Sequence, residues 1–527
     1  MAHHGKHEPH QVANSGDPRR WWVLGVLCLA LLIVVLDNTI LNVALPTIQK
    51  DLNATQSQQE WMVDAYTLAF AGMLFTFGVL GDRLGRKRML AIGMLVFGAG
   101  SAASAWASSP GMLIATRTLM GVGGAAVMPS TLSIITNVFD PRERGRAIGI
   151  WAGVSGMAIA IGPITGGALL EGFWWGSVFL INIPVVIIGI LGTLFIVPES
   201  KDPHPQRVDV PGVVLSVIGL VALVYGIIKG GENNQWASAG VLVPLIAGAV
   251  LLAIFVVLER RSRHPSLDVT LFKNPAFSAA SVAISLVFFG LFGATFFLTF
   301  YLQFDRGYSP LEAGIRLLPV AIAILVFAPR SSKVAQRIGN KATVAGGMSL
   351  SLIAFLGYQL LDTGTTIWVL EGVLLIQGIG MAHVMAPATE SIMSALPRER
   401  AGAGSAVNNT MRQVGGALGV AILGSLLSTA FRSRISPTLD AAHLSAAART
   451  VAGQSIGGLY QVVGNGQQPT GPIWTQGQSA FIHAMHITAL GSALVVLIGI
   501  VVVLVWLPGK APASRESMRE TSEPVHV

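Results

Sequence analysis

Three charged residues stand inside stretches of sequence that are otherwise apolar. Asp37 occurs in "VVLDNTILNVALP" (34–46), Asp64 in "EWMVDAYTLAF" (60–70), and Arg117 in the apolar segment 111–132. An ionised side chain deep in such a segment costs roughly 2.5–3.5 kcal/mol on insertion scales, so it requires a partner or a function. A carboxylate beside an arginine is suited to taking up a proton on one side of a membrane and releasing it on the other. A static ion pair that holds helices together is the alternative interpretation.

Composition places these residues in a membrane protein. Of the 527 residues, 52% are hydrophobic and 11% are charged, whereas a soluble domain carries about 25% charged residues. Apolar windows of 18 residues or more recur along the whole chain, each long enough to cross about 30 Å of hydrocarbon. Only helices and closed barrels satisfy the backbone in lipid, and these windows are too long and uniformly apolar for barrel strands. The sequence therefore predicts an all-α polytopic membrane protein.

The apolar windows predict fourteen transmembrane helices. Their expected ranges are 21–45, 60–80, 89–108, 111–132, 146–170, 175–197, 210–229, 237–258, 275–303, 314–329, 342–361, 366–390, 402–430 and 479–507.

Lys and Arg orient these helices. With the N-terminus inside, 25 of the 34 basic residues fall on the inner side, seven fall on the outer side, and Arg117 and Arg412 lie within helices. This asymmetry predicts that both termini are cytoplasmic. Because the net charge of +8 lies in short loops between apolar segments, it indicates topology and excludes a nucleic-acid-binding surface.

A weak internal repeat divides the chain. The segment 120–147 resembles 377–403, and "PRER" occurs at 141–144 and again at 397–400. Two related halves around a midplane site are typical of secondary transporters. We therefore expect a tail at 1–20, a six-helix half at 21–197, two inserted helices at 210–258, a second six-helix half at 275–507 with an external loop at 431–478, and a tail at 508–527.

Four motifs carry a family resemblance. The loop "GVLGDRLGRKRM" (78–89) resembles the signature loop of the major facilitator superfamily, and "RSSKVAQRIGNK" (330–341) is a degenerate copy of it that has Gln336 in place of the aspartate. "RTLMGVGG" (117–124) and "AIGPITGG" (160–167) resemble further motifs of that superfamily, and the second marks its exporters. "LDNTILNVALP" (36–46) resembles the first-helix motif of its fourteen-helix drug:proton antiporters. The resemblance covers the whole chain and implies the major facilitator fold.

The resemblance also implies roles for these motifs. The signature loop is expected to latch the two halves on the cytoplasmic side, through Gly81, Asp82, Arg83, Gly85 and Arg86. We expect Asp82 to cap a helix N-terminus and the basic residues to pair with acids across the inner face. The exporter motif, with Gly162, Pro163, Gly166 and Gly167, is expected to form a close-packed, bendable joint between the halves.

Depth predicts which charges within the membrane meet. At about 1.5 Å of rise per residue, Asp37, Asp64 and Arg117 lie roughly 12, 6 and 10 Å below the outer ends of their segments. All three therefore lie in the outer half of the membrane, and we expect them to serve proton coupling. In the family, matching acids in the first two helices are used for protons and cationic drugs, so Asp64 is also a candidate substrate contact.

Further candidate substrate-binding residues lie in the second half. Phe292, Phe296 and Phe300 lie on one face of segment 275–303, and the repeat matches that segment to the first helix, which lines the cavity in this superfamily. Such rings suit flat, lipophilic, often cationic compounds, with lipid contact as the alternative. Arg412, with Asn408 one turn before it, is placed to hold a counter-acid or an anionic substrate group. His383 could titrate, although a plain hydrogen-bonded histidine is the simpler interpretation.

These observations predict a proton-coupled antiporter that exports lipophilic or cationic drugs or antibiotics across a bacterial cytoplasmic membrane. A dedicated exporter of one metabolite, lipid or self-made antibiotic is the alternative. Because the sequence shows no nucleotide-binding loop and no catalytic or metal-binding cluster, we expect no enzyme activity, cofactor or metal. The expected partners are a small drug-like molecule, protons and the lipid bilayer, and the protein is taken to be a monomer.

Overall fold

The computed structural model describes residues 19–202, 208–233, 235–262, 267–395, 401–464 and 469–508. Within these ranges the chain is helical and contains no strand. Thirteen helices are long and apolar enough to cross a membrane. The segment α5 (Pro141–Gly172), which includes residues whose side chains are not described, is not among the thirteen, and it packs lengthwise against α1. The fourteen expected helices are thus matched by thirteen candidate spans and α5.

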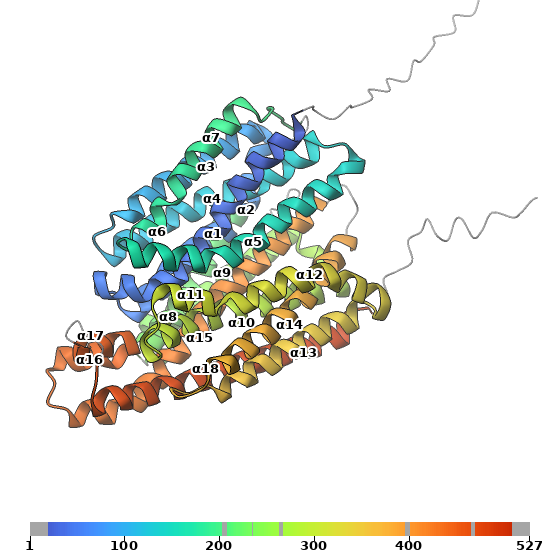
Figure 1. Ribbon diagram of the computed structural model, residues 1–527. Coiled ribbons are helices and arrows are strands. Elements are labelled where there is room, and N and C mark those ends of the chain that lie inside the picture. Colours follow the sequence, from blue (N-terminus) through green and yellow to red (C-terminus); the bar gives the residue numbers. More distant parts are fainter. Residues whose placement is uncertain are drawn as a thin grey trace, which may run out of the picture.

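The first half of the bundle occupies the upper part of Figure 1. Its elements are α1 (Arg20–Leu52), α2 (Gln56–Leu84), α3 (Arg86–Ala105), α4 (Pro110–Val138), α5, the short α6 (Ser177–Leu180) and α7 (Asn182–Phe195). The second half lies below it and comprises α10 (Pro275–Phe300), η2 (Tyr301–Asp305), α11 (Pro310–Arg316), α12 (Leu318–Ile338), α13 (Asn340–Gly357), η3 (Tyr358–Leu360), α14 (Ile367–Ser394), α15 (Ala401–Ala441), α16 (Ala446–Gln454), α17 (Ile456–Gly464) and α18 (Pro472–Trp506).

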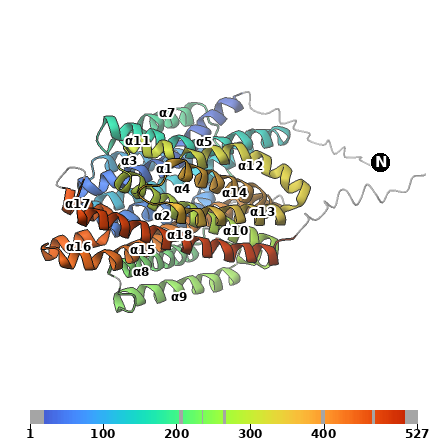
Figure 2. The same cartoon turned by 60° about the horizontal axis from the view of Figure 1, so that its bottom comes forward.

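Two helices are inserted between the halves. They are α8 (Val210–Asn233) and α9 (Ala239–Arg261), followed by the 3-10 turn η1 (Val269–Lys273). The helix α8 packs beside α2 and α15, and α9 packs on α8. The helix α8 touches both halves closely, since a Cβ on Gly72 of α2 would lie 2.3 Å from Val217 and one on Gly231 would lie 2.4 Å from Ser425 of α15. The helix α9 is the outermost of the pair (Figure 2). The order of elements therefore agrees with two six-helix halves and an insert.

The ends of several helices differ from the sequence-based prediction. The helix α1 continues to Leu52, where Asn53 adopts a left-handed conformation, and α2 begins at Gln56 after a capping box formed by Thr55 and Gln58. The helices α15 and α18 extend to Ala441 and back to Pro472, so the expected loop 431–478 is mostly helical. Hydropathy detects only the lipid-facing core of a helix and misses polar turns that continue it beyond the membrane.

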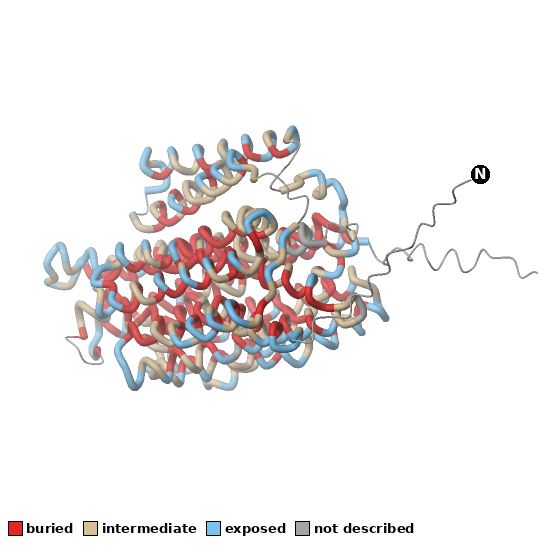
Figure 3. The backbone as a smooth tube through the Cα atoms, turned by 90° about the horizontal axis from the view of Figure 1, so that it is seen from above, coloured by how far each residue is buried: buried red, intermediate tan, exposed pale blue. Residues whose placement is uncertain are grey.

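The distribution of apolar residues suits a lipid environment. Buried positions gather on the inward sides of the helices, and the outer sides carry intermediate and exposed positions (Figure 3). Many outward side chains are large and apolar: Phe195, Val243 and Val505 are 76%, 63% and 68% exposed. An outer surface of this kind is stable in hydrocarbon and not in water.

The internal repeat is visible in the backbone. The signature loop joins α2 to α3 at Gly85, whose φ is +117°, and its degenerate copy joins α12 to α13 at Gly339, whose φ is +88°. Positive φ favours glycine, so both copies keep a glycine at the turn. The second PRER motif, 397–400, lies outside the described residues, as do nearly all of the predicted tails.

We name the two ends of the bundle by what they carry. The terminal end holds the first turn of α1 and the last turn of α18, and the loop end holds α16 and α17 (Figure 1).

Candidate functional site

The centre of the first half contains the ion pair expected from the sequence. Arg117 of α4 is fully buried, Asp37 of α1 is 2% exposed, and Nη1 of Arg117 contacts Oδ2 of Asp37. The other carboxylate oxygen, Oδ1, accepts a hydrogen bond from Nδ2 of Asn182 at 3.1 Å. Both oxygens of Asp37 are therefore satisfied by side chains of other helices.

Arg117 is held by α2 as well. Its Nε donates to the carbonyl oxygen of Met62 at 3.2 Å, and its guanidinium carbon lies 4.3 Å from the centre of the Tyr66 ring. The hydroxyl of Tyr66 donates to the carbonyl oxygen of Val34 in α1 at 3.1 Å. A guanidinium over a buried aromatic face gains a cation–π interaction in addition to its ion pair.

Asn182 ties the pair to the rest of the half. Its Nδ2 also donates to Oγ of Ser101 in α3 at 3.0 Å, and Ser101 donates to the carbonyl oxygen of Phe179 at 2.8 Å. The network thus joins α1, α2, α3, α4, α6 and α7. Removing one partner of a buried ion pair typically costs 3–5 kcal/mol, so a proton on Asp37 would strongly alter how these helices pack.

Asp64 does not join this network. It lies two residues before Tyr66, whose ring contacts Arg117, so its side chain leaves α2 about 200° round the helix from that ring. It is fully buried, and its two carboxylate oxygens have no hydrogen-bond partner among the described residues. The structure therefore brings together two of the three charges that depth predicted to meet.

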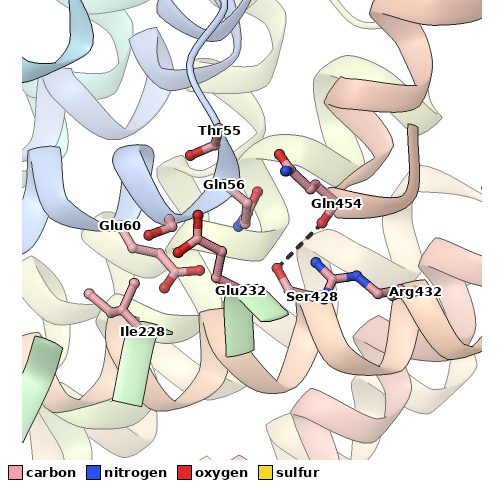
Figure 4. A pocket seen from close by; sticks show the side chains of 9 residues that line it. Thr55, Gln56, Glu60, Ile228, Glu232, Ser428, Arg432 and Gln454 are labelled. Carbon is pink, nitrogen blue, oxygen red and sulfur yellow. Dashed lines mark hydrogen bonds between the residues drawn. The ribbon is translucent and has the colours of Figure 1, made fainter. Parts of the chain in front are cut away.

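Glu60, one turn before Asp64, lies on the same face of α2 and is 2% exposed. It lines a pocket of about 230 Å³, open solvent included, between α2, α8, α15 and α16. Figure 4 shows Glu60 and Glu232 in this pocket with Gln56, Ser428 and Arg432, and Ser428 donates to the backbone oxygen of Gln454 at 3.4 Å. Two acids thus line a pocket at the loop end, and one of them, Glu60, is one turn of α2 from Asp64.

The exporter motif lies where α5 meets α1 and α11. A Cβ on Gly162 would lie 1.9 Å from Oγ1 of Thr39, and one on Gly167 would lie 2.4 Å from the Cα of Leu311. From the other side, a Cβ on Gly314 would lie 2.3 Å from the carbonyl oxygen of Pro163. Backbones in such contact require glycine. The halves are therefore tightly packed at this point, whereas an added Cβ on Gly149 or Gly153 would meet no described atom within 4 Å.

The signature loop is tied to its own half. Asp82 accepts from Nε of Arg86 at 2.9 Å and pairs with Nη2 of Arg86 at 2.8 Å. In the first turn of α3, the backbone N–H of Lys87 donates to Oε1 of Glu199 at 3.2 Å. The carboxylate at the N-terminus of α3 is therefore that of Glu199, and the capping of a helix by Asp82 stays a prediction. Within the part of the chain that the structure describes, the polar contacts of the loop run to residues 194–202, including Arg86 N to the oxygen of Ser200 at 3.0 Å. A Cβ on Gly85 would lie 2.7 Å from the Glu199 carboxylate. Gly81 is buried and Arg83 is exposed.

The aromatic stripe of α10 lies inside the protein. Phe296 and Phe300 are each 1% exposed with ring centres 5.3 Å apart, and Phe292 is half-buried against Gly416 of α15. Lipid contact is therefore excluded for Phe296 and Phe300. Whether the stripe faces the substrate in another conformation stays a prediction.

The remaining candidates of the second half are spread out. The guanidinium carbon of Arg412 lies 5.2 Å from the ring centre of Phe288, and its Nε has no partner among the described residues. Asn408 is 5% exposed and accepts from Oγ1 of Thr389 at 3.5 Å. His383 has Nδ1 2.8 Å from the carbonyl oxygen of Ile379 in its own helix, in agreement with a hydrogen-bonded structural histidine.

Sequence analysis missed three residues of the site. Asn182 and Tyr66 are polar groups in apolar segments, and their isolation there was the available signal. Glu60 was assigned to the start of its helix, where an acid is ordinary, because the helix was expected to begin at 60 and not at Gln56.

Comparison with known proteins agrees with this architecture. The sequence profile of the Major Facilitator Superfamily matches residues 27–420. The methyl viologen resistance protein SmvA of Salmonella typhimurium strain LT2 is 34% identical over 493 residues, which is 91% of this chain and 97% of that protein. The multidrug efflux pump LfrA of Mycolicibacterium smegmatis is 35% identical over 495 residues, 93% and 97% of the two chains. The puromycin resistance protein pur8 of Streptomyces alboniger is 36% identical over 422 residues, 78% and 82%.

Among solved structures, a bacterial homologue of the human lysosomal transporter Spinster, in an inward-facing and unoccupied conformation, has a TM-score of 0.66 at 17% identity. The match covers 95% of this chain and all of that one. The fold is therefore shared although the sequences have diverged. This chain is a multi-pass membrane transport protein that belongs to the major facilitator superfamily.

Proposed function

We propose that the protein is a proton-coupled antiporter that exports lipophilic or cationic drugs across the cytoplasmic membrane. Its relatives are named for multidrug efflux and for resistance to methyl viologen and puromycin. The observation that carries the proposal is the contrast between two buried acids on neighbouring helices, Asp37 with a guanidinium partner and Asp64 without one.

Asp64 provides the exchange site in this proposal. An unpaired carboxylate in an apolar interior is stabilised by binding a proton or another cation, and it cannot hold both. When the site is open to the outside, a proton enters and displaces a bound cation outward. When it is open to the inside, a cation from the cytoplasm displaces the proton inward. Competition for one carboxylate therefore produces antiport.

Asp37 links proton binding to conformation. A proton on Asp37 removes its attraction to Arg117, and Arg117 then loses the partner that fixes it between α1, α2 and α4. The pair thus responds to protons whether or not the substrate is charged. This coupling step serves neutral lipophilic compounds as well as cations.

The basic residues orient the transporter. We place the terminal end in the cytoplasm and the loop end outside, because 25 of the 34 Lys and Arg residues then lie on the inner side. In this orientation the packed exporter motif lies toward the outside of the membrane, and the open positions Gly149 and Gly153 lie toward the cytoplasm.

The test is cation transport into everted membrane vesicles under an imposed pH gradient. Vesicles that contain the wild type should accumulate ethidium, and this accumulation should be lost when the gradient is dissipated. Asp37→Asn should remove the part of the accumulation that depends on the gradient. Asp440→Asn, which neutralises an acid whose side chain is 71% exposed, is the matched control. Uptake that does not respond to the gradient would contradict the proposal.

A further inference from the structure

The loop end contains a lysine seated on aromatic rings. Lys50, in the last turn of α1, places Nζ 4.1 Å from the ring centre of Tyr460 and 5.1 Å from that of Phe304. Tyr460 belongs to α17 and Phe304 to η2, so the cation comes from the first half and the rings from the second.

The two rings belong to a packed aromatic cluster. The ring centre of Tyr460 lies 5.1 Å from that of Phe304 and 5.8 Å from that of Trp474, the latter in an edge-on arrangement. Phe304 is fully buried, Trp474 is 5% exposed, and Lys50 is exposed. Ring faces around a single positive charge are the means by which proteins recognise ammonium groups. We call Phe304, Tyr460 and Trp474 the aromatic cage.

Polar contacts beside the cage hold α1 against α17. Nε2 of Gln49 donates to Oγ of Ser455 at 3.2 Å, and Nε2 of Gln461 donates to the carbonyl oxygen of Gln49 at 2.8 Å. A Cβ on Gly457 would lie 1.9 Å from Oε1 of Gln49. The end of α1 thus seats directly on α17. Any separation of the two halves at the loop end breaks these contacts and lifts Lys50 from the cage.

We propose that the aromatic cage is an exit subsite for organic cations, occupied by the ammonium of Lys50 while the loop end is closed. This proposal rests on the proposed function and extends it to a second site for the substrate. When α1 moves away, the faces of Tyr460 and Phe304 that Lys50 covered become available to a cation leaving the protein.

Lys50 makes the release of a substrate from this subsite directional. A substrate cation and the Lys50 ammonium compete for the same ring faces, and closure of the loop end returns Lys50 to the cage. The departing cation is therefore displaced outward and cannot remain in the closing protein. A neutral substrate has no such competitor, because ring faces attract positive charge specifically.

Equilibrium binding of radiolabelled tetraphenylphosphonium to the purified full-length protein tests the proposal. All variants carry Asp64→Asn, so that the deep carboxylate does not contribute. Adding Lys50→Gln vacates the cage and should tighten binding by about three- to tenfold. Lys50→Arg keeps a cation in place and should not tighten binding. Lys229→Gln, which frees the ring of Tyr225 from a lysine 5.4 Å away in α8, is the matched control and should also have no effect.

Substitution of the cage separates recognition from simple gating. In the Lys50→Gln protein, Tyr460→Phe retains the ring and should retain the gain, whereas Tyr460→Leu should abolish it. Neutral triphenylphosphine oxide should bind equally in all variants. Unchanged binding in Lys50→Gln, or an equal gain for the neutral compound, would overturn the subsite and leave Lys50 as a mechanical contact.

The two proposals fail in different ways. If transport does not respond to a pH gradient while Lys50 still controls tetraphenylphosphonium binding, the antiport proposal is wrong and the subsite stands. If proton-driven export is measured and Lys50→Gln leaves binding unchanged, the subsite is wrong and the antiport proposal stands.

Discussion

Asp37 and Asp64 are both buried aspartates on neighbouring helices, yet their surroundings differ completely. Asp37 is held by Arg117 and by Asn182, and it belongs to a network that joins α1 to five further helices. Asp64 lies in the same half with both oxygens unpartnered among the described residues, and the acid Glu60 is one turn away.

From this difference we propose that the two acids have different roles in transport. A satisfied ion pair responds to a proton by changing how helices pack, because the cation that remains is left buried without its partner. An unpaired carboxylate responds by becoming available or unavailable to a second cation. The first kind of site suits coupling and the second suits exchange, and each of the following changes tests that division.

The largest effect is expected from Asp37→Asn. The change leaves Arg117 buried without its counter-charge, and it should abolish gradient-driven export of every substrate while membrane insertion remains intact. Vesicle assays with one cationic and one neutral substrate provide the measurement, and immunoblots of the membranes provide the insertion control. Normal efflux by this variant would remove Asp37 from the mechanism.

Asp64→Asn should affect cations selectively. A charge-assisted contact is worth about 1.5–3 kcal/mol, so apparent affinity for a cationic drug should fall by roughly 10- to 100-fold, with a much smaller change for a neutral one. The measurement is the efflux rate as a function of substrate concentration, made for a cationic and for a neutral drug in the variant and in the wild type. Equal losses for both classes would assign Asp64 to coupling, and the contrast with Asp37 would disappear.

Replacing residues 436–476 with a short Gly/Ser linker should have an intermediate effect. The replacement removes α16 and α17, and with them the contacts of Ser455 and Gln461 to Gln49. Folding should survive, because the interior of the first half does not depend on this segment, but efflux rate or substrate range should change. Export of every compound at the parent rate would make the segment a passive tether.

Asp82→Asn should have the smallest effect. It breaks a partly exposed pair with Arg86, and such pairs are worth at most about 1 kcal/mol, or roughly fivefold. We expect slower transport with an unchanged ratio between cationic and neutral substrates, since the loop lies far from both acids. A shift in that ratio would show that the loop influences the site.

Much of the fold follows from the sequence because lipid leaves few alternatives. Long apolar windows predicted the helices, and the internal repeat predicted two halves with an insert. The predicted positions of the helix ends were less accurate, because the polar turns that extend α1 to Leu52 and begin α18 at Pro472 have no hydropathy signal. For the same reason the segment 431–478 was expected to be an external loop, whereas the end of α15, α16, α17 and the start of α18 make most of it helical.

The contacts of the site could be predicted where the depth of two charged residues in the membrane is enough to show that they meet. Asp37 and Arg117 are the acid and the base at matching depth in different helices, and they do pair. The position of Asp64 could not be predicted in this way, because depth does not specify which face of α2 turns toward α4. Asn182 and Tyr66 were missed because a neutral polar side chain carries a weaker sequence signal than a charge.

The most direct test of the central claim is the number of protons released when a cation binds the purified protein. A pH-sensitive dye in lightly buffered detergent solution would report the release as tetraphenylphosphonium is added. Competition for one carboxylate predicts about one proton per cation in the wild type, none in Asp64→Asn, and release retained in Asp440→Asn. Binding without proton release in the wild type, or the same release from Asp64→Asn, would contradict the account.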